Sequence, residues 1–326
     1  MYYVYISDTK SVSKMENFWN LDMKCQIKKE DKSEWIGGEY YIQTSLYNYI
    51  KNNENFKIIC IDKSYNNKIF EDAKIILVPG WTSLPAEYNK YINKIYSYSY
   101  FENMSKINII LNPFKYNKLN LFLPVTPIEL PINKISNINF NDYNINGLLV
   151  GKCISHIISK KKDNKLIEIL NSLKYKIFST MRELHNFKNM PNYLINNKDK
   201  YIELNKIICN HDKLNNLGIL NPLDFRFLLK HCKYVIFIHG AFSPPTIIEA
   251  LFEKCIILAT QDVIPSDLLN NTNIYLLDNK SNNEINELIE NIENNIICFD
   301  MDAFPIDYLP ENKLKFLDKI IINENI

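Results

Sequence analysis

Residues 217–260 decide the fold, and they read LGILNPLDFRFLLKHCKYVIFIHGAFSPPTIIEALFEKCIILAT. Apolar side chains recur there at helical spacing, at Leu223, Phe227 and Leu228. Residues 234–238 are a short apolar run rich in β-branched and aromatic side chains, which is typical of a strand buried on both faces. A turn and an apolar helix follow, and residues 255–259 read as the next strand. The pattern predicts a βαβ unit.

The turn of this unit has the features of an anion site. A helix that follows a parallel strand begins with backbone N–H groups that have no partner inside the helix, and its dipole also attracts negative charge. Glycine lets the backbone approach a ligand, and proline in the first helical turn loses no needed hydrogen bond. We therefore expect a diphosphate to bind at Gly240, Ser243, Pro245 and Thr246.

Glu249 lies about one turn inside the same predicted helix. A carboxylate there does not bind phosphate, but it can accept hydrogen bonds from two hydroxyl groups, such as those of a ribose. Phosphate on the backbone and ribose on a carboxylate together indicate a nucleotide-sugar donor site. The alternative from the residues alone is a structural βαβ unit in which Glu249 is solvated.

Over residues 217–260 the chain resembles the N-acetylglucosaminyltransferase V family, the β-1,6-N-acetylglucosaminyltransferases that branch N-glycans. The resemblance rests on the Gly218-Ile219-Leu220 turn, the Asp224-x-x-Phe227-Leu228-Leu229 helix and the Glu249-Ala250 pair, with Lys254-Cys255 in place of a Gly-Cys element. It implies an α/β GT-B fold, in which two Rossmann-like doubly wound domains face a central cleft. It also implies UDP-N-acetylglucosamine as donor, no metal, and a uracil that pairs with the backbone of residues 218–220. Exostosin-like transferases carry a similar element, so another nucleotide sugar stays open.

The chain of 326 residues suits two domains of about 150 residues each. We expect an acceptor-side Rossmann-like domain over residues 1–140 and a nucleotide-sugar domain over residues 141–308. Residues 309–326 are expected to form a helix that crosses back to the first domain, by analogy with GT-B proteins. Residues 145–150 read as the first strand of the second sheet, and Lys152 after it either reaches the diphosphate or is solvated.

Composition excludes several other classes. The net charge of +1 gives no reason to expect nucleic acid. Seven cysteines lack C-x-x-C spacing and no histidine pairs with a carboxylate at metal-ligand spacing, so we expect free thiols, no bound metal and no cofactor. The start, MYYVYIS, reads as a strand rather than a signal peptide, and no apolar run approaches the ~20 residues of a membrane span. We expect a cytoplasmic protein, and the oligomeric state stays open.

The rest of the chain reads as alternating strands and helices. Strands are expected at residues 2–7, 56–61, 74–78 and 107–111, with helices at 39–51 and from 84 to about 98. In the second half, residues 203–209 read as a short strand.

A glycosyltransferase needs a base that takes the proton of the attacking sugar hydroxyl. The resemblance implies a glutamate in a Gly-Thr-Glu-Pro-Glu-Phe-like loop, but residues 81–88 read WTSLPAEY, so that motif is not kept. Glu87 is the nearest carboxylate, although a glutamate at a helix start is also favoured by the helix dipole. Glu129 is the second candidate.

The first hypothesis is therefore an inverting, metal-independent glycosyltransferase that transfers N-acetylglucosamine to a glycan hydroxyl. The alternatives are a GT-B transferase that uses another nucleotide sugar, a nucleotide-sugar hydrolase or epimerase, and a non-catalytic protein that binds nucleotide sugars.

Overall fold

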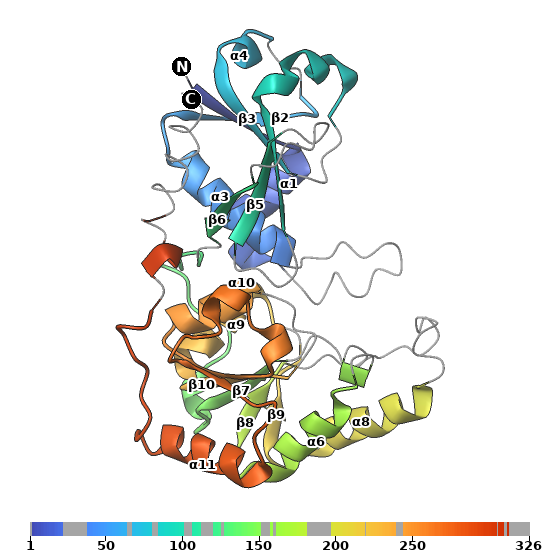
Figure 1. The fold of residues 1–326 in the computed structure, drawn as a ribbon, viewed down its shortest axis with the longest axis vertical. Helices are drawn as coiled ribbons and strands as arrows, with labels where there is room; N and C mark the ends of the chain where they lie inside the picture. The colour runs from blue at the N-terminus through green and yellow to red at the C-terminus, as the bar shows by residue number, and fades with distance from the viewer. Residues whose placement is uncertain are drawn as a thin grey trace. The chain divides into compact units, whose positions relative to one another are not determined.

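The computed structural model describes residues 2–21, 38–63, 67–79, 84–100, 106–111, 120–124, 127–150, 157–158, 161–180, 197–218, 220–238, 244–304, 306–309 and 312. These residues form two compact units (Figure 1). The second unit runs from Leu130 to Phe304, and the first holds the described residues up to Glu129 and those after residue 305. The division falls after Glu129, where the sequence places a boundary after residue 140. The expected terminal helix lies outside the described residues.

The first unit is built on a six-stranded sheet in the order β2-β1-β3-β4-β5-β6. Its strands are β1 (Tyr2–Ser7), β2 (Phe56–Cys60), β3 (Ala73–Pro79), β4 (Ile95–Tyr100), β5 (Lys106–Leu111) and β6 (Asn120–Pro124). The first four strands are parallel, β5 is antiparallel to β4, and β6 is antiparallel to β5. The unit therefore begins as a Rossmann-like sheet and ends as a meander.

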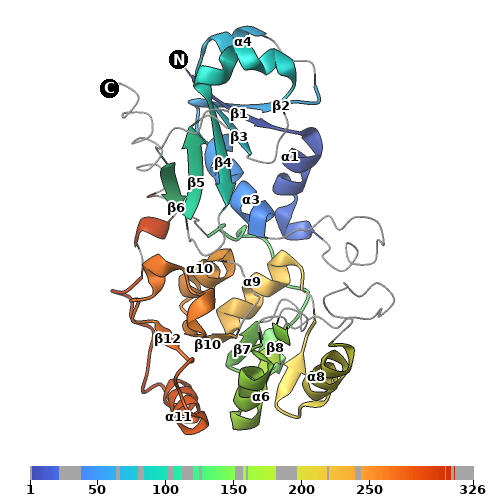
Figure 2. The same ribbon diagram turned by 45° about the vertical axis from the view of Figure 1, so that its right-hand side comes forward.

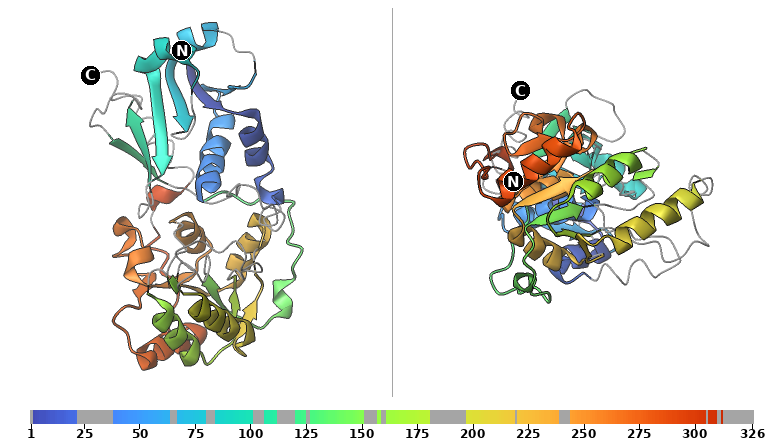
Figure 3. Two further views of the ribbon diagram at one scale, coloured as in Figure 1. Left: turned by 90° about the vertical axis from the view of Figure 1, so that its right-hand side faces the viewer. Right: turned by 90° about the horizontal axis from the view of Figure 1, so that it is seen from below.

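Helices cover both faces of this sheet. They are α1 (Thr9–Glu16), α3 (Gly38–Lys51) and α4 (Asn67–Glu71), with 3-10 helices at Phe18–Asn20, Ala86–Lys94 and Ile306–Tyr308. Figure 3 shows α1 and α3 side by side on one face, and Tyr5 of β1 and Tyr98 of β4 share a hydrogen bond of 2.9 Å between their hydroxyls. On the other face the phenylalanine of α4 and the tyrosines of the second 3-10 helix join a fully buried core.

The helix that we expected from residue 84 to about 98 is wrong in its second half. The structure has a 3-10 helix at Ala86–Lys94 and then the strand β4. In IYSYSY tyrosine and serine alternate from residue 96 on, and in a strand a period of two puts odd and even side chains on opposite faces of the sheet. Ile95 accordingly packs in the α4 core, and Tyr98 packs on the opposite face. The strand at residues 107–111 is therefore the fifth of this sheet, not the fourth.

The second unit has a six-stranded sheet in the order β12-β11-β10-β7-β8-β9, and every pairing in it is parallel. Its strands are β7 (Gly147–Val150), β8 (Ile177–Ser179), β9 (Leu214–Asn216), β10 (Tyr234–Phe237), β11 (Ile256–Ala259) and β12 (Ile274–Leu276). The three central strands are wholly buried, as expected for a parallel sheet covered on both faces. The predicted Rossmann-like organisation is confirmed.

The helices of this unit form a layer on each face. They are α6 (Asp163–Ser172), α8 (Lys198–Asn210), α9 (Pro222–His231), α10 (Pro244–Phe252) and α11 (Asn282–Glu293). Figures 1 and 2 show α9 and α10 together on one face of the sheet and α6 with α11 on the other. The strand that we expected at residues 203–209 is wrong, because α8 covers it. Tyr201, Leu204 and Ile208 are buried at helical spacing, so the period of 3.6 prevails over local strand propensity.

Candidate functional site

The strand order of the second sheet places a topological switch point between β7 and β10. The chain moves outward from β7 to β8 and β9, then returns to β10 and continues to β11 and β12 on the other side. Open parallel sheets bind ligands outside the carboxyl ends of the strands at such a point, because the loops there diverge to opposite faces. The loops after β7 and β10 hold the expected diphosphate residues, of which Lys152, Gly240 and Ser243 lie outside the described residues. The topology thus puts the carboxyl ends of β7 and β10 at the point of the sheet where a ligand is expected.

The helix α10 begins seven residues after β10, at the same edge of the sheet. Pro244 and Pro245 are its first two residues, Pro245 is buried, and Thr246 in the same turn is half-buried. Proline has no backbone N–H, so these two residues leave no unpaired donor in the first turn of the helix. The sequence-based placement of a helix start at these residues is confirmed, and its role in binding a diphosphate stays a prediction.

Glu249 is buried in α10 and forms an ion pair with Arg226 of α9. The Arg226 Nη1 atom lies 3.2 Å from Glu249 Oε1, and Arg226 Nε donates to Glu253 Oε1 at 2.5 Å. The Glu249 side chain is 8% exposed, and the Arg226 side chain is 1% exposed. The reading of Glu249 as a merely solvated residue is therefore wrong.

The arginine ties the two helices of one layer together. Its guanidinium carbon lies 4.9 Å from the centroid of the Phe252 ring, so charge, hydrogen bonds and stacking combine at one side chain. A buried carboxylate needs such a partner, since an uncompensated charge in a protein interior is costly. Arg226 therefore fixes the Glu249 carboxylate in one place. Sequence reasoning missed Arg226, although it is one of only two arginines in a chain with 38 basic residues.

The turn before α9 is held on its strand side by backbone and side-chain bonds. Leu217 N donates to Ser179 O at 2.8 Å, and Gly218 N donates to Asn216 Oδ1 at 3.2 Å. Gly218 has φ of +64°, a left-handed conformation that favours glycine, and a Cβ added there would meet nothing within 4 Å. Leu220 is buried, and Ile219 lies outside the described residues. The backbone conformation thus favours glycine at this position, and the role of the turn in binding uracil stays a prediction.

Asp224 fixes the other end of this turn, and sequence reasoning gave it no such role. It is the third residue of α9, it is buried, and its carboxylate accepts a bond of 2.7 Å from the side-chain amide of Asn221. It also accepts bonds of 2.6 Å from Ser136 Oγ and 3.0 Å from Asn137 N. Only the fold could reveal these partners, because they lie 87 and 88 residues away in the sequence.

A second charged group lies at the carboxyl edges of β11 and β12. Lys162, at the start of α6, lies 3.6 Å from Asp262 Oδ1 and 3.4 Å from Asp278 Oδ1. Asp278 also accepts a bond of 2.5 Å from the Gln261 backbone. The lysine compensates these carboxylates and connects three loops of one edge, so the group has a clear structural role.

The two candidate bases lie in the first unit and are both exposed. Glu87 is the second residue of the 3-10 helix that follows β3, and β3 is parallel to β1 as the prediction required. Glu129 lies next to Ile128, a buried residue whose backbone N–H donates to the Tyr41 hydroxyl at 2.8 Å. The choice between the two glutamates stays a prediction.

Two aspartates lie at the carboxyl edge of the first sheet, and both are used to hold α1. Asp8 caps that helix, with its carboxylate accepting bonds from Ser11 N at 2.8 Å and Ser11 Oγ at 2.7 Å. Asp62 accepts bonds from the backbone and hydroxyl of Thr9, and these bonds lower its pKa. A base works best when its pKa lies near the working pH, so the lowered pKa argues against Asp62 in that role.

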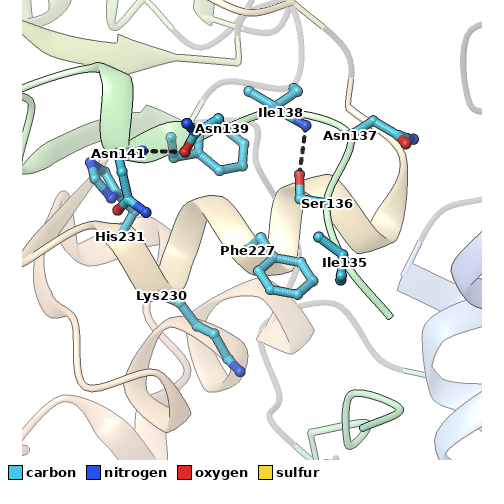
Figure 4. Close-up of a pocket in the computed structure, with 10 residues that line it drawn as sticks. Ile135, Ser136, Asn137, Ile138, Asn139, Asn141, Phe227, Lys230 and His231 are labelled. Carbon is cyan, nitrogen blue, oxygen red and sulfur yellow. Dashed lines mark hydrogen bonds between the residues drawn. The ribbon is translucent and has the colours of Figure 1, made fainter. Parts of the chain in front are cut away.

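A surface depression of about 430 Å³ lies in the second unit, between α9 and residues 135–141. Those residues, here called the strap, run along the helix and face Phe227, Lys230 and His231 (Figure 4). The side chains do not converge on one point: in Figure 4 the amide of Asn137 and the ammonium of Lys230 point in different directions. We therefore regard the depression as the gap between strap and helix.

The described residues contain no group of three or more side chains arranged to hold a metal ion. Burial raises the pKa of both Cys232 and Cys255, whose thiols are therefore protonated and unreactive. Within the described part of the chain, no helix is both long enough and apolar enough to cross a bilayer.

No protein-family model and no curated protein sequence matches this chain. Among solved structures, the chain is similar to the Staphylococcus aureus MnaA–UDP co-structure, with a TM-score of 0.50, 11% identity, and coverage of 99% of this chain and 96% of that one. It is also similar to AviGT4, a glycosyltransferase involved in avilamycin A biosynthesis, with a TM-score of 0.55, 9% identity, and coverage of 98% and 97%. The UDP-GlcNAc 2-epimerase of Methanocaldococcus jannaschii in complex with UDP-GlcNAc and UDP has a TM-score of 0.45, 11% identity, and coverage of 98% and 100%. The first two likenesses extend over nearly the whole of each chain, and with the two Rossmann-like units they show that this protein has the GT-B fold.

Proposed function

We propose that this protein is an inverting glycosyltransferase that transfers a sugar from a UDP-sugar, with UDP-N-acetylglucosamine as donor, to a hydroxyl group of a glycan. The observation that carries the proposal is the switch point between β7 and β10, where α10 begins just after β10. The S. aureus protein of the same fold is in a co-structure with UDP, and AviGT4 is a glycosyltransferase, which supports this choice. The N-acetylglucosaminyltransferase V resemblance of residues 217–260 supports the donor sugar.

In this proposal the donor diphosphate binds the first turn of α10. Pro244 and Pro245 have no backbone N–H to donate, so the N–H groups of Thr246 and Ile247 and the helix dipole compensate its charge. The ribose hydroxyls donate to Glu249, and the uracil pairs with the backbone of residues 218–220. The Arg226 ion pair is compatible with ribose binding, because a carboxylate offers about four acceptor positions on its two oxygens. Holding Glu249 in place beforehand spares the complex the entropy of ordering that side chain.

The reaction is a single displacement at the anomeric carbon of the donor sugar. The acceptor oxygen forms a bond to that carbon while the bond to the β-phosphate oxygen breaks, so the configuration inverts. The acceptor proton passes to a carboxylate, for which Glu87 of the first unit is our first choice. The negative charge that develops on UDP is stabilised by the α10 amides, which need not reorganise during the step.

The proposal is tested by incubating the protein with a panel of UDP- and GDP-sugars and a set of glycan acceptors. We expect transfer from a UDP-sugar, with an anomeric configuration opposite to that of the donor by NMR. An isomerised nucleotide sugar, or hydrolysis in the presence of acceptor, would assign the site a different reaction. Binding without turnover would make the protein a non-catalytic homologue, and no binding of any member would overturn the nucleotide-sugar site.

A further inference from the structure

Asp224 receives more hydrogen bonds than capping of α9 requires. Its carboxylate accepts from Ser136 Oγ, Asn137 N and Asn221 Nδ2, while its own backbone N–H donates to Asn221 Oδ1 at 2.8 Å. The residue is only 5% exposed. Three donors on one buried carboxylate fix its position closely, because each is a charge-assisted bond.

The start of α11 shows what a purely local cap looks like. Ser281 and Glu284 form a reciprocal capping box there, and the Glu284 carboxylate returns to the backbone N–H of Ser281. The corresponding residues of α9 are Asn221 and Asp224, at the same spacing. Asp224 has a shorter side chain, and its carboxylate binds instead the Asn221 side chain and the strap. The α9 cap thus connects the helix start to a segment outside the helix.

This connection bears directly on the turn that precedes α9. At its strand end, the backbone N–H of Leu217 donates to Ser179 O of β8. At its helix end, Asn221 is held by Asp224, whose carboxylate accepts from the Asn221 amide and whose backbone N–H donates to Asn221 Oδ1. Three residues, 218–220, remain between these anchors. With so short a span, a shift of the helix end moves the backbone N–H and C=O groups of the turn.

We propose that Asp224 is a positioning residue that sets the base specificity of the nucleotide site. By holding Asn221 against the strap, it fixes the backbone of residues 218–220 in the geometry that pairs with a uracil edge. The inference rests on the proposed function, which places uracil at this turn. It adds that the strap, through Ser136 and Asn137, is part of the machinery that selects the base.

The Asp224→Asn variant separates this role from general stability. The new amide cannot satisfy all its neighbours: whichever way it turns, an N–H group faces either the Asn221 amide or the Asn137 N–H. Combining Asp224→Asn with Asn221→Asp exchanges amide and carboxylate and restores a complementary pair. Ser136→Ala is a milder variant that removes one donor from the strap side. Ser281→Ala is the matched control, because it removes a helix cap far from the turn.

The measurement is calorimetric affinity for UDP and for ADP, which share the diphosphate and differ in the base. For Asp224→Asn we expect UDP affinity to fall about tenfold, as for one lost charged hydrogen bond, and ADP affinity to stay within about twofold. The UDP preference should fall by less in Ser136→Ala, return in the exchanged double variant, and be unchanged in Ser281→Ala. Thermal denaturation shows which variants are folded, and if Asp224→Asn is not, the other variants decide.

Three results would overturn the inference, and they are distinguishable. If the wild-type protein binds UDP selectively and the folded Asp224→Asn and Ser136→Ala variants keep that preference, Asp224 does not position the base site while the proposed function stands. If the wild-type protein does not bind UDP, the proposed function fails and this inference fails with it. A Ser281→Ala variant that lost the preference equally would show that any loss of stability has this effect, which would also refute the specific role of Asp224.

Discussion

The second unit keeps its sheet parallel to both edges, whereas the first unit changes direction after β4. In the second unit every described strand ends at the edge where the following helix begins, so helix starts accumulate there. In the first unit α1, α4 and a 3-10 helix begin after the parallel strands β1, β2 and β3, and the antiparallel β5 and β6 add no further helix start. A helix start offers N–H groups to phosphate, and an antiparallel meander does not, which is why the proposed function places the charged donor on the second unit. In the proposed function the first unit supplies the acceptor side.

Replacing Glu87 with glutamine tests whether the first unit supplies the general base, and we expect it to have the largest effect. If Glu87 of the first unit is the base, transfer should fall by at least ~10²-fold, because a general base contributes ~10²–10⁴-fold in rate. UDP affinity should be unchanged, since the donor belongs to the second unit. Initial rates and calorimetry on the same preparation check both expectations.

Glu129→Gln is the matched variant, because Glu129 is also an exposed glutamate of the first unit. If it abolishes transfer while Glu87→Gln is active, the base belongs to the later segment. Full activity of both variants would mean that neither glutamate is the base, and the family resemblance would then not extend to the first unit.

Glu249 tests the other side of the comparison. Glu249→Gln should weaken UDP binding by about 1–3 kcal/mol, the cost of losing a charged hydrogen-bond partner. Glu253→Gln is a close control, because Glu253 contacts the same guanidinium one helical turn further from the start of α10. Both variants should lower the unfolding midpoint, and only Glu249→Gln should lower UDP affinity. An equal loss of UDP affinity in both variants would mean that Arg226, Glu249 and Glu253 only stabilise the packing of α9 on α10, and that Glu249 does not contact the ribose.

The sequence predicted those parts of the fold where its local pattern favours only one kind of secondary structure. β10 and β11 are apolar throughout, and the α10 start is marked by paired prolines, so their positions follow from residues 234–259 alone. The segment 95–100 was misread because tyrosine and isoleucine suit either period, and only its pairing with β3 decides for a strand. The prediction for residues 203–209 was wrong in the opposite direction, because a strand was expected there. The structure has the helix α8, whose buried face includes Tyr201, Leu204 and Ile208.

The features of the candidate site also differ in whether the sequence alone could predict them. The turn at Gly218 follows from local sequence, because glycine is the residue that most readily adopts its positive φ, while the binding of uracil there stays a prediction. The partners of Glu249 and Asp224 could not, because Arg226 lies 23 residues from Glu249 and Ser136 lies 88 residues from Asp224. A single sequence shows which residue types are present, and it does not show which of them the sheet brings together. The rarity of arginine in this chain was a usable signal, but it singles out Arg182 as much as Arg226.

Gly147→Ala tests the packing of the second sheet at its centre. A Cβ at Gly147 would lie 2.4 Å from Cζ of Tyr234 in the neighbouring strand, and Tyr234 is fully buried. We expect destabilisation of about 1–3 kcal/mol, as for other overpacked cores, measured by denaturant unfolding. Gly218→Ala is the comparison, because it adds the same methyl group to open space and costs only backbone strain. A Gly147→Ala protein as stable as wild type would show that the ring can move aside, so the sheet centre is looser than its burial suggests.

The smallest expected effect is that of removing divalent metal. If the α10 amides compensate the donor phosphates, the second unit needs no ion, and EDTA should leave the transfer rate unchanged. The expectation follows from the comparison of the units, because helix starts gather at the carboxyl edge of the parallel sheet and supply fixed positive charge there. The clearest measurement is the initial rate after dialysis against EDTA, with and without added manganese or magnesium, at a donor concentration below saturation so that weaker donor binding would be visible. Loss of activity in EDTA and its return with manganese would mean that the phosphates are held by an ion, and the amides of α10 would then lose the role that this argument gives them.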